Sequence, residues 1–191
     1  MTSLTQQAQE RITSHLLAGD IVVDATCGNG FDTVFLAEQV GPSGHVFAFD
    51  IQALAIKNTL QLLKEQSLEQ QVTVTLKSHD TMKQVVPVKF HKKISTVMFN
   101  LGYLPGSDKS CITTTDSTIS ALKQSLFLLK DDGCLSIMLY PGHEGGQDET
   151  DAVIEWTKGL SENWKIEHTV TAGPQWLLIQ PTIFSNTESC Y

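Results

Sequence analysis

The chain has 191 residues, enough for one domain spanning 1–191, and its 41% hydrophobic and 18% charged residues are typical of a globular protein. Its net charge of −8 argues against broad nonspecific affinity for nucleic acid; the basic stretch at 89–93 is compatible with a local cationic patch, and more simply with a solvated loop. No apolar run is long enough to span a bilayer, no basic-flanked signal segment opens the chain and no two cysteines are closely paired, so we expect no membrane partner, no metal site and a reducing cytoplasm.

Apolar periodicity predicts alternating helices and strands in chain order. A helix over 3–17 comes first and is expected to pack on the sheet or to cover a ligand, and the tail from 185 is expected to fray. The alternation is typical of a doubly wound, mainly parallel α/β sheet with helices on both faces. An antiparallel strand pair at 164–170 and 176–180 closes the fold. The other predicted strands are 21–25, 45–49, 72–76, 94–99 and 134–140, and the other helices begin near 32, 51, 113 and 149.

The first predicted strand ends in a small-residue turn that opens a helix, as in nucleotide-type cofactor sites. The spacing Gly28-x-Gly30-x-x-Thr33 lacks the third glycine of the dinucleotide fingerprint and the lysine of a phosphate loop. Two carboxylates, Asp24 and Asp32, flank the turn and would repel a pyrophosphate, whereas they suit a ligand that carries an ammonium and a sulfonium. An ordinary strand-to-helix turn with Asp32 as a helix cap is the plainer alternative.

Polar residues at the ends of the next two strands strengthen the ligand interpretation. Asp50 can accept both hydroxyls of a ribose, and Gln52 either reaches the same ligand or lies exposed at a helix start. Ser78 and His79 follow the third strand at the carboxyl edge, where open α/β sheets bind ligands; His79 is expected near adenine, and helix capping is the alternative for Ser78. The glycine turn together with Asp50 indicates S-adenosylmethionine as the cofactor.

Two polar loops leave the same predicted edge of the sheet. One covers 100–110 after the fourth strand, and the other covers 141–147 after the fifth. Long loops rich in glycine and proline at this edge are usually functional. We therefore expect both loops to contribute to the site.

Several stretches together resemble a bacterial methyltransferase family once labelled putative rRNA methylases: VVDATCGNGFDT, FAFDIQ, KSHD, MFNLGYLPGSDKS and the Gly-His-x-Gly-Gly loop, within residues 19–164. The resemblance implies a Rossmann-like class I methyltransferase fold that uses S-adenosylmethionine. It also implies methylation of the aminomethyl nitrogen of 5-aminomethyl-2-thiouridine at the wobble position of the tRNA anticodon loop, giving 5-methylaminomethyl-2-thiouridine. The implied cofactor residues are Asn29, Asp32, Asp50, Gln52 and His79, with Thr26, Gly28 and Ser78 as neighbours; Asp24 and Gly30 complete the predicted set.

The sequence departs from the family at two places on the expected substrate side. Residues 140–143 read Tyr-Pro-Gly-His where the family usually has Tyr-His-Gly-His, and residues 172–176 read Ala-Gly-Pro-Gln-Trp where a Gln-Asn-Pro-Pro-like segment is common. These departures bear on the choice of substrate more than on the use of the cofactor.

The stretch from Asn100 to Tyr103 resembles the Asn/Asp-Pro-Pro-Tyr/Phe loop of amino-methylating enzymes. We predict that Asn100 accepts hydrogens of the acceptor amine and aims its lone pair, while Tyr103 stacks on the base. Because an alkyl amine is mostly protonated at neutral pH, Asp108 or His143 is the predicted proton acceptor. A loop salt bridge for Asp108 and a loop hydrogen bond for His143 are the alternatives.

Other functions remain compatible with the sequence. A methyltransferase of the same fold acting on rRNA or a small amine is one, a noncatalytic module that senses S-adenosylmethionine is another, and an NAD-dependent dehydrogenase is a weaker third. The polar 100–110 loop argues against a sensor, and the missing third glycine argues against the dehydrogenase. A homodimer that combines basic residues of two chains is one arrangement that would offer RNA a cationic surface.

Overall fold

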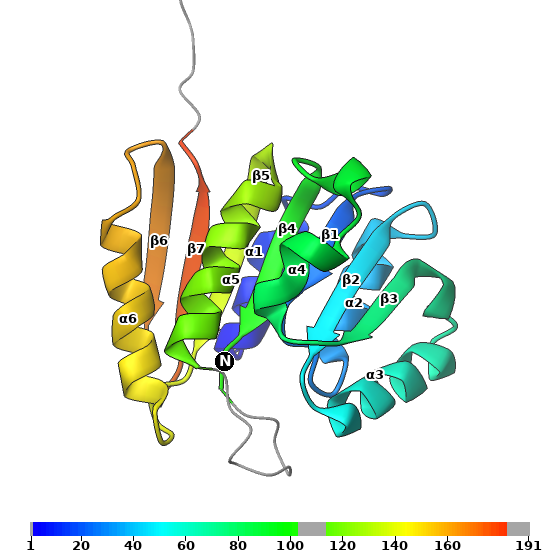
Figure 1. Ribbon diagram of the computed structural model, residues 1–191, viewed down its shortest axis with the longest axis horizontal. Coiled ribbons are helices and arrows are strands. Elements are labelled where there is room, and N and C mark those ends of the chain that lie inside the picture. Colours follow the sequence, from blue (N-terminus) through cyan, green and yellow to red (C-terminus); the bar gives the residue numbers. More distant parts are fainter. Residues whose placement is uncertain (1, 103–113, 183–191) are drawn as a thin grey trace, which may run out of the picture.

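Seven strands form one sheet in the order β3-β2-β1-β4-β5-β7-β6 (Figure 1). The computed structural model describes residues 2–102 and 114–182. Strands β1 to β5 run parallel, whereas β7 runs antiparallel to both of its neighbours, so the predicted fold class is confirmed. The strands are β1 Ile21–Asp24, β2 His45–Asp50, β3 Val72–Leu76, β4 Ile94–Asn100, β5 Leu129–Leu139, β6 Trp164–Val170 and β7 Gln175–Pro181.

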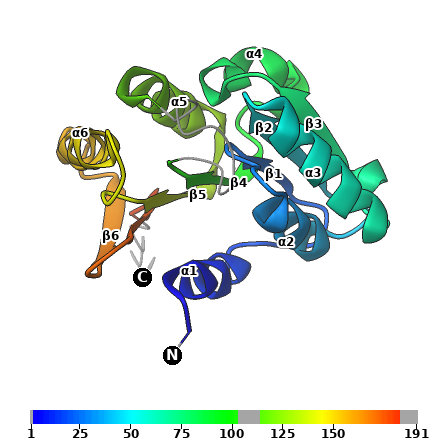
Figure 2. The same cartoon turned by 90° about the horizontal axis from the view of Figure 1, so that it is seen from below.

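The strand order reverses at β1, and this reversal decides which face each helix covers. Right-handed crossovers place α2 and α3 on one face, and the crossovers that return through β4 place α4 and α5 on the other. Figure 2 shows α1 and α2 on one side of the sheet, and α4, α5 and α6 on the other. The α-helices are α1 Leu4–Thr13, α2 Phe31–Val40, α3 Ala53–Glu65, α4 Met82–Val85, α5 Thr115–Leu128 and α6 Gly146–Lys158.

The central strands are buried because helices cover both of their faces. In β4 every residue except the last, Asn100, is buried. Phe49 on β2, Phe99 on β4 and Leu135 on β5 are among the large side chains that are fully buried in the main core. Burying one such side chain contributes about 1.5–3 kcal/mol, so this core fixes the carboxyl edge at which β1, β2 and β4 end.

Helix α1 packs against β5 and β7 through a small apolar cluster. A capping box at Ser3 starts the helix and satisfies its first backbone donors. Leu4 and Ala8, one turn apart, are buried with Trp176 and Leu178 of β7. This packing fixes the rotation of α1 about its own axis. The rotation in turn decides which residues of α1 face the carboxyl edge of the sheet.

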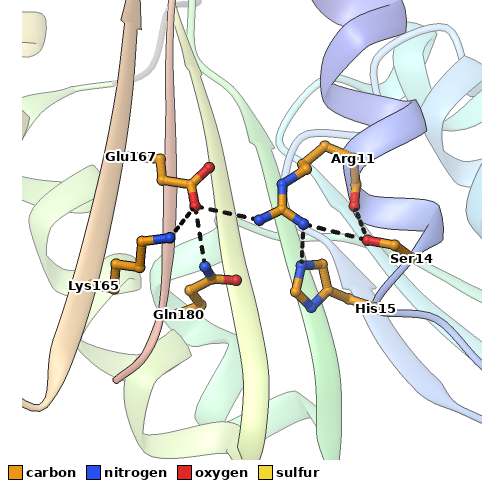
Figure 3. Close-up of polar contacts among 6 residues, drawn as sticks. All are labelled: Arg11, Ser14, His15, Lys165, Glu167 and Gln180. Atoms are coloured by element: carbon orange, nitrogen blue, oxygen red, sulfur yellow. Dashed lines mark hydrogen bonds and ion pairs between the residues drawn. The ribbon is translucent and has the colours of Figure 1, made fainter. Parts of the chain in front are cut away.

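Polar contacts join the other end of α1 to the antiparallel strands (Figure 3). The guanidinium of Arg11 lies 3.3 Å from the carboxylate of Glu167, to which Lys165 also donates at 2.8 Å and Gln180 at 3.2 Å. A second guanidinium nitrogen of Arg11 lies 3.2 Å from Nε2 of His15. Partly exposed ion pairs of this kind contribute at most about 1 kcal/mol, so apolar burial dominates the docking of α1.

The first helix is shorter than predicted, because it ends at Thr13 and not at 17. The chain then turns, and the backbone N–H of Leu17 donates to Asp20 at 2.9 Å. Leu16 is still buried, against the strands and α2, although it is no longer helical. Because Leu16 is buried, the apolar periodicity of the sequence continues past the end of the helix. The predicted helix was therefore too long.

Two other elements begin earlier than predicted. Strand β5 begins at Leu129, which pairs with Ile94 before a register shift brings Cys134 opposite Thr96. Helix α6 begins at Gly146, directly after Gly145 in a left-handed conformation. The remaining strand boundaries agree with the prediction within one residue.

Across residues 2–102 and 114–182, no helix combines the length and apolar character needed to cross a membrane. The same residues bring together no group of three His, Cys, Asp or Glu side chains that could hold a metal ion. Cys27 and Cys134 are buried thiols, and burial raises the pKa of Cys134 to about 11. Cys111 and Cys190 lie outside the described residues.

Candidate active site

A cavity of about 830 Å³ lies at the carboxyl edge of the sheet, where β1, β2 and β4 end. It collects residues from the ends of five strands, β1 to β5, and from α1, which are far apart in the sequence. Of the predicted site residues, Asp24 and Gly30 support the glycine turn from outside the lining, and Tyr103 and Asp108 lie outside the described residues. The predicted residues that line the cavity are Thr26, Gly28, Asn29, Asp32, Asp50, Gln52, Ser78, His79, Asn100 and His143.

The glycine turn is held against α3 and can be built only with glycine at its last position. Gly28 and Gly30 have φ angles of 51° and 88°. A Cβ added to Gly30 would lie 2.9 Å from Cα of Thr59, which is closer than real contacts allow. The hydroxyl of Thr59 donates to the carbonyl of Gly28 at 3.1 Å. The turn therefore depends on α3 as well as on the strand that precedes it.

Asp50 joins the ends of the first two strands. Its carboxylate accepts from the backbone N–H of Gly28 at 3.0 Å and from that of Gln52 at 2.9 Å. Beside it, the side chain of Asn29 accepts from the amide of Asn58 on α3 at 2.9 Å. Each carboxylate oxygen of Asp50 keeps further lone pairs, so this residue can accept hydroxyl groups of a ligand while it holds the turn.

The two acids that flank the turn are held where ionisation is unfavourable. Asp24 is 1% exposed and accepts from the Thr33 hydroxyl at 2.6 Å and from the Thr26 N–H at 3.2 Å. Burial and the nearby charge of Asp32 raise the pKa of Asp24 to about 7. Burial also raises the pKa of Asp32, although its hydrogen bonds with Gln9 and Asn100 oppose the rise. A cationic ligand would favour the ionised form of both acids, and an anionic one would not.

Asn100 lies at the centre of a polar network. Its amide nitrogen donates to Asp32, and its amide oxygen accepts from the hydroxyl of Tyr140 at 3.3 Å. Its backbone N–H donates to the Thr26 hydroxyl at 2.7 Å. One carboxylate oxygen of Asp32 accepts from Gln9 and the other from Asn100, so the nitrogen of the Asn100 amide points toward Asp32. The amide oxygen is thereby presented on the opposite side, where Tyr140 reaches it.

Helix α1, which was expected to pack on the sheet or to cover a ligand, also takes part in this network. Gln9 donates to the second carboxylate oxygen of Asp32 at 2.7 Å, and Thr5 lines the cavity one turn earlier. Tyr140, which also lines the cavity, has a pKa raised mainly by burial. Phe31 and Ile51 are two further cavity residues that were not predicted, and both are exposed. Gln9 and Thr5 carry no motif, so nothing in the sequence could have marked them.

His79 is buried at the wall of the cavity with one nitrogen satisfied. Its Nδ1 lies 3.3 Å from the carbonyl oxygen of Ala25, and its ring makes an edge contact with Phe99. Its Nε2 has no hydrogen-bond partner among the described residues. Burial lowers the pKa of His79, so the ring is neutral and Nδ1 carries the proton that Ala25 accepts. Nε2 is then a buried acceptor, which fits the exocyclic amine of an adenine.

His143 lines the cavity from the loop after β5. A Cβ added to Gly102 would lie 3.2 Å from Nε2 of His143, and one added to Gly146 would lie 2.8 Å from it. Its Nδ1 lies 2.9 Å from the carbonyl oxygen of Glu144. The ring therefore packs closely against both glycines, and a side chain at Gly146 would force it to shift.

Comparison with known proteins places the chain in a family. The family model described as "Putative rRNA methylase" matches residues 46–173, which is more than half of the chain. An Arabidopsis thaliana protein named tRNA (mnm5s2U34)-methyltransferase, chloroplastic, is 43% identical over 150 residues, which are 74% of this chain and 54% of that protein. The chain spans about half the length of the curated relatives it matches.

Two solved structures resemble the chain over almost its whole length. A structure described as a putative rRNA-methylase from Clostridium thermocellum has a TM-score of 0.90 and 36% identity, covering 95% of this chain and 99% of that one. A structure described as a putative methyltransferase from Streptococcus mutans in complex with SAH has a TM-score of 0.83 and 30% identity, with the same coverage of 95% and 99%. The chain therefore belongs to the family described as "Putative rRNA methylase".

Proposed function

We propose that the protein is an S-adenosylmethionine-dependent N-methyltransferase that converts 5-aminomethyl-2-thiouridine at the tRNA wobble position to 5-methylaminomethyl-2-thiouridine. The coarser assignment, an S-adenosylmethionine-dependent methyltransferase, follows from the family and from the class I fold. The finer assignment is supported by the Arabidopsis thaliana relative, whose name is that of a tRNA methyltransferase for the nucleoside mnm5s2U34. The anticodon loop of tRNA is the proposed partner.

The observation that carries the proposal is the fixed amide of Asn100. Asp32 holds its nitrogen, so its oxygen is the group available to accept a hydrogen from an incoming amine. Such an acceptor suits an amine nucleophile, because it draws N–H groups away from the lone pair and aims the lone pair at the methyl group. A hydroxyl or carbon nucleophile has no need of this arrangement.

The residues proposed to hold the cofactor line the same cavity. Asp50 is assigned to the ribose hydroxyls, and the Nε2 acceptor of His79 to the adenine amine. Asn29 and Asp32 are assigned to the amino-acid part, with Gly28 allowing close approach of the backbone. When bound, S-adenosylmethionine supplies an electrophilic methyl carbon on a cationic sulfur and becomes neutral S-adenosylhomocysteine. Asp24, which is buried, and Asp32, which is partly buried, both have raised pKa values and favour a ligand of positive charge.

The transfer needs a neutral amine and a place for one proton. A nitrogen–carbon bond forms while the carbon–sulfur bond breaks, and the sulfur keeps the electron pair. The nitrogen begins as a neutral primary amine and carries one proton too many after transfer, so one proton leaves. His143, held beside Gly102 and Gly146 on the cavity wall, is the proposed acceptor of a proton; Asp108 and the stacking residue Tyr103 lie outside the described residues and keep their predicted roles as proposals.

Labelled S-adenosylmethionine tests the proposal with two forms of one tRNA. Transfer to tRNA carrying 5-aminomethyl-2-thiouridine is expected, with no transfer to the same tRNA that lacks the aminomethyl group. Equal transfer to both forms would reject the aminomethyl nitrogen as the acceptor.

Two alternatives to the proposed function are methylation of another acceptor, either rRNA or a small amine, and a module that binds the cofactor without catalysing a reaction. The description of the family favours rRNA, and the net charge of −8 is compatible with a small amine. Label that enters rRNA or a free amine but not the modified tRNA would support them. Transfer to any nucleic acid would remove the noncatalytic module. The cytoplasmic location and the homodimer stay predictions.

A further inference from the structure

The basic residues gather in one part of an acidic chain. Residues 81–130 contain seven of the 13 Lys and Arg residues but two of the 21 Asp and Glu residues. This segment therefore carries a charge of +5, while the rest of the chain carries −13. It contains α4, β4 and α5, and α4 and α5 lie next to each other on one face of the sheet (Figure 1).

Cationic side chains of this segment converge on one exposed ring. The Nζ atom of Lys83 lies 4.0 Å from the ring centroid of Phe127, and that of Lys92 lies 5.4 Å from it. The ring of His91 makes an edge contact with the same ring at 5.6 Å. Lys123 precedes Phe127 by four residues on α5 and so lies on the same face. We call Lys83, His91, Lys92, Lys123 and Phe127 the Phe127 patch.

The lysines of the Phe127 patch are not neutralised by neighbouring acids. Five ion pairs occur among residues 2–102 and 114–182, and none involves Lys83, Lys92 or Lys123. All three side chains are exposed. Lys130, by contrast, pairs with Asp20 and is not part of the patch. Among the described residues no acidic side chain forms an ion pair with these three lysines, so their positive charges add on this surface.

Helix α5 runs from the cavity of the candidate active site to the Phe127 patch. Ser117, in the first turn of α5, lines the cavity. At 1.5 Å per residue, Lys123 lies about 9 Å and Phe127 about 15 Å farther along the helix axis. An RNA whose target base enters the cavity has the phosphates of its flanking nucleotides at distances of this order. The patch thus lies within reach of the backbone beside the target nucleotide.

We propose that the Phe127 patch binds the phosphate backbone of the RNA next to the nucleotide that enters the cavity. The inference rests on the proposed function, because it assumes an RNA substrate. Lysine binds phosphate as a point charge, and the ring of Phe127 holds two of the ammonium groups near one position. Such contacts orient an RNA without reading its sequence, so the acidic chain gains affinity from one cationic face.

Binding of a tRNA transcript without modified nucleosides tests the patch separately from catalysis. Fluorescence anisotropy is measured with S-adenosylhomocysteine present, from about 50 to about 200 mM salt. The variant combines Lys83→Gln, Lys92→Gln and Lys123→Gln. The matched control combines Lys57→Gln, Lys64→Gln and Lys158→Gln, which remove the same charge from α3 and α6.

The patch variant should lose at least tenfold in affinity at about 100 mM salt, and its slope of log affinity against log salt should be shallower by about 2–3. The control should stay within about threefold of the wild type, since its lysines lie off the proposed RNA path. Thermal unfolding of both variants checks that each is folded.

Equal salt slopes for the patch variant and the control would overturn the patch, as would a wild type that binds no transcript. A change of oligomeric state in the patch variant, seen by light scattering without any change in RNA affinity, would assign the patch to a protein contact instead and overturn it too. A wild type that binds RNA through the patch but transfers no methyl group to the modified tRNA would reject the proposed function and leave the patch standing.

Discussion

Removing the charge of Asp24 should stabilise the ligand-free protein above neutral pH. Burial and the nearby Asp32 raise the pKa of Asp24 from 3.8 to about 7 in the folded protein. Between about pH 4 and pH 7 the unfolded chain therefore binds fewer protons than the folded one, so the free energy of unfolding falls as the pH rises. The whole fall corresponds to about 4 kcal/mol and is complete above about pH 7.

Asp24→Asn keeps the size of the side chain and an oxygen that can accept from the backbone, but it removes the charge. Urea unfolding at several pH values from about 5 to 8, without ligand, should show this fall in the wild type and not in the variant. At about pH 8 the variant should then be more stable, by up to about 4 kcal/mol. Titrating groups other than Asp32, whose charge interacts with that of Asp24, act in both proteins and cancel in the comparison. Parallel pH dependences of the two proteins would refute the reasoning.

The same charge should link cofactor binding to pH. S-adenosylmethionine carries a sulfonium that S-adenosylhomocysteine lacks, so its affinity should depend more on an ionised Asp24. Calorimetry should show that its affinity rises about tenfold from pH 6 to pH 8, with a smaller rise for S-adenosylhomocysteine and a flatter profile in Asp24→Asn. Identical profiles for both ligands would contradict an electrostatic role for the acids beside the turn.

Three other substitutions separate the parts of the site. Asn100→Ala should lower turnover about a hundredfold while calorimetry finds cofactor affinity within about threefold of the wild type; loss of cofactor binding would instead place Asn100 on the cofactor side. Gly30→Ala should cost more in thermal unfolding than Gly41→Ala, for which about 1–2 kcal/mol is expected, because both have positive φ but open space surrounds only Gly41. Equal losses would show that the turn does not press on α3. Gln9→Leu should lower kcat about tenfold and move the pH profile of kcat upward, because Asp32 loses a hydrogen-bond donor. The control Gln7→Leu, on the exposed side of α1, should change neither kcat nor its pH profile. An unchanged kcat in Gln9→Leu would exclude α1 from the site.

Cavity residues could be predicted from the sequence where a polar side chain or a glycine turn directly follows a predicted strand. The glycine turn, Asp50, His79 and Asn100 each follow a short apolar run, and parallel order brings the ends of such runs to one edge. Local composition alone therefore indicated which residues would meet, before any packing was known. The same logic located the loop of His143.

The partners of these residues could not be predicted, because packing between distant segments decides them. Gln9 reaches Asp32 only because Leu4 and Ala8 set the rotation of α1 on β7, and the sequence gives no sign of that register. The proton position on His79 depends on the carbonyl of Ala25, on another strand end. The raised pKa of Asp24 likewise requires its burial, which its position at the end of a strand does not reveal.

Mass analysis of nucleosides from a tRNA reaction tests the central claim most directly. After incubation with the protein and S-adenosylmethionine, 5-aminomethyl-2-thiouridine should disappear as 5-methylaminomethyl-2-thiouridine forms, with fragmentation locating the new methyl group on the exocyclic nitrogen. A methyl group found on the ring or the ribose, or an unchanged wobble nucleoside under conditions where the protein binds its cofactor, would contradict the account.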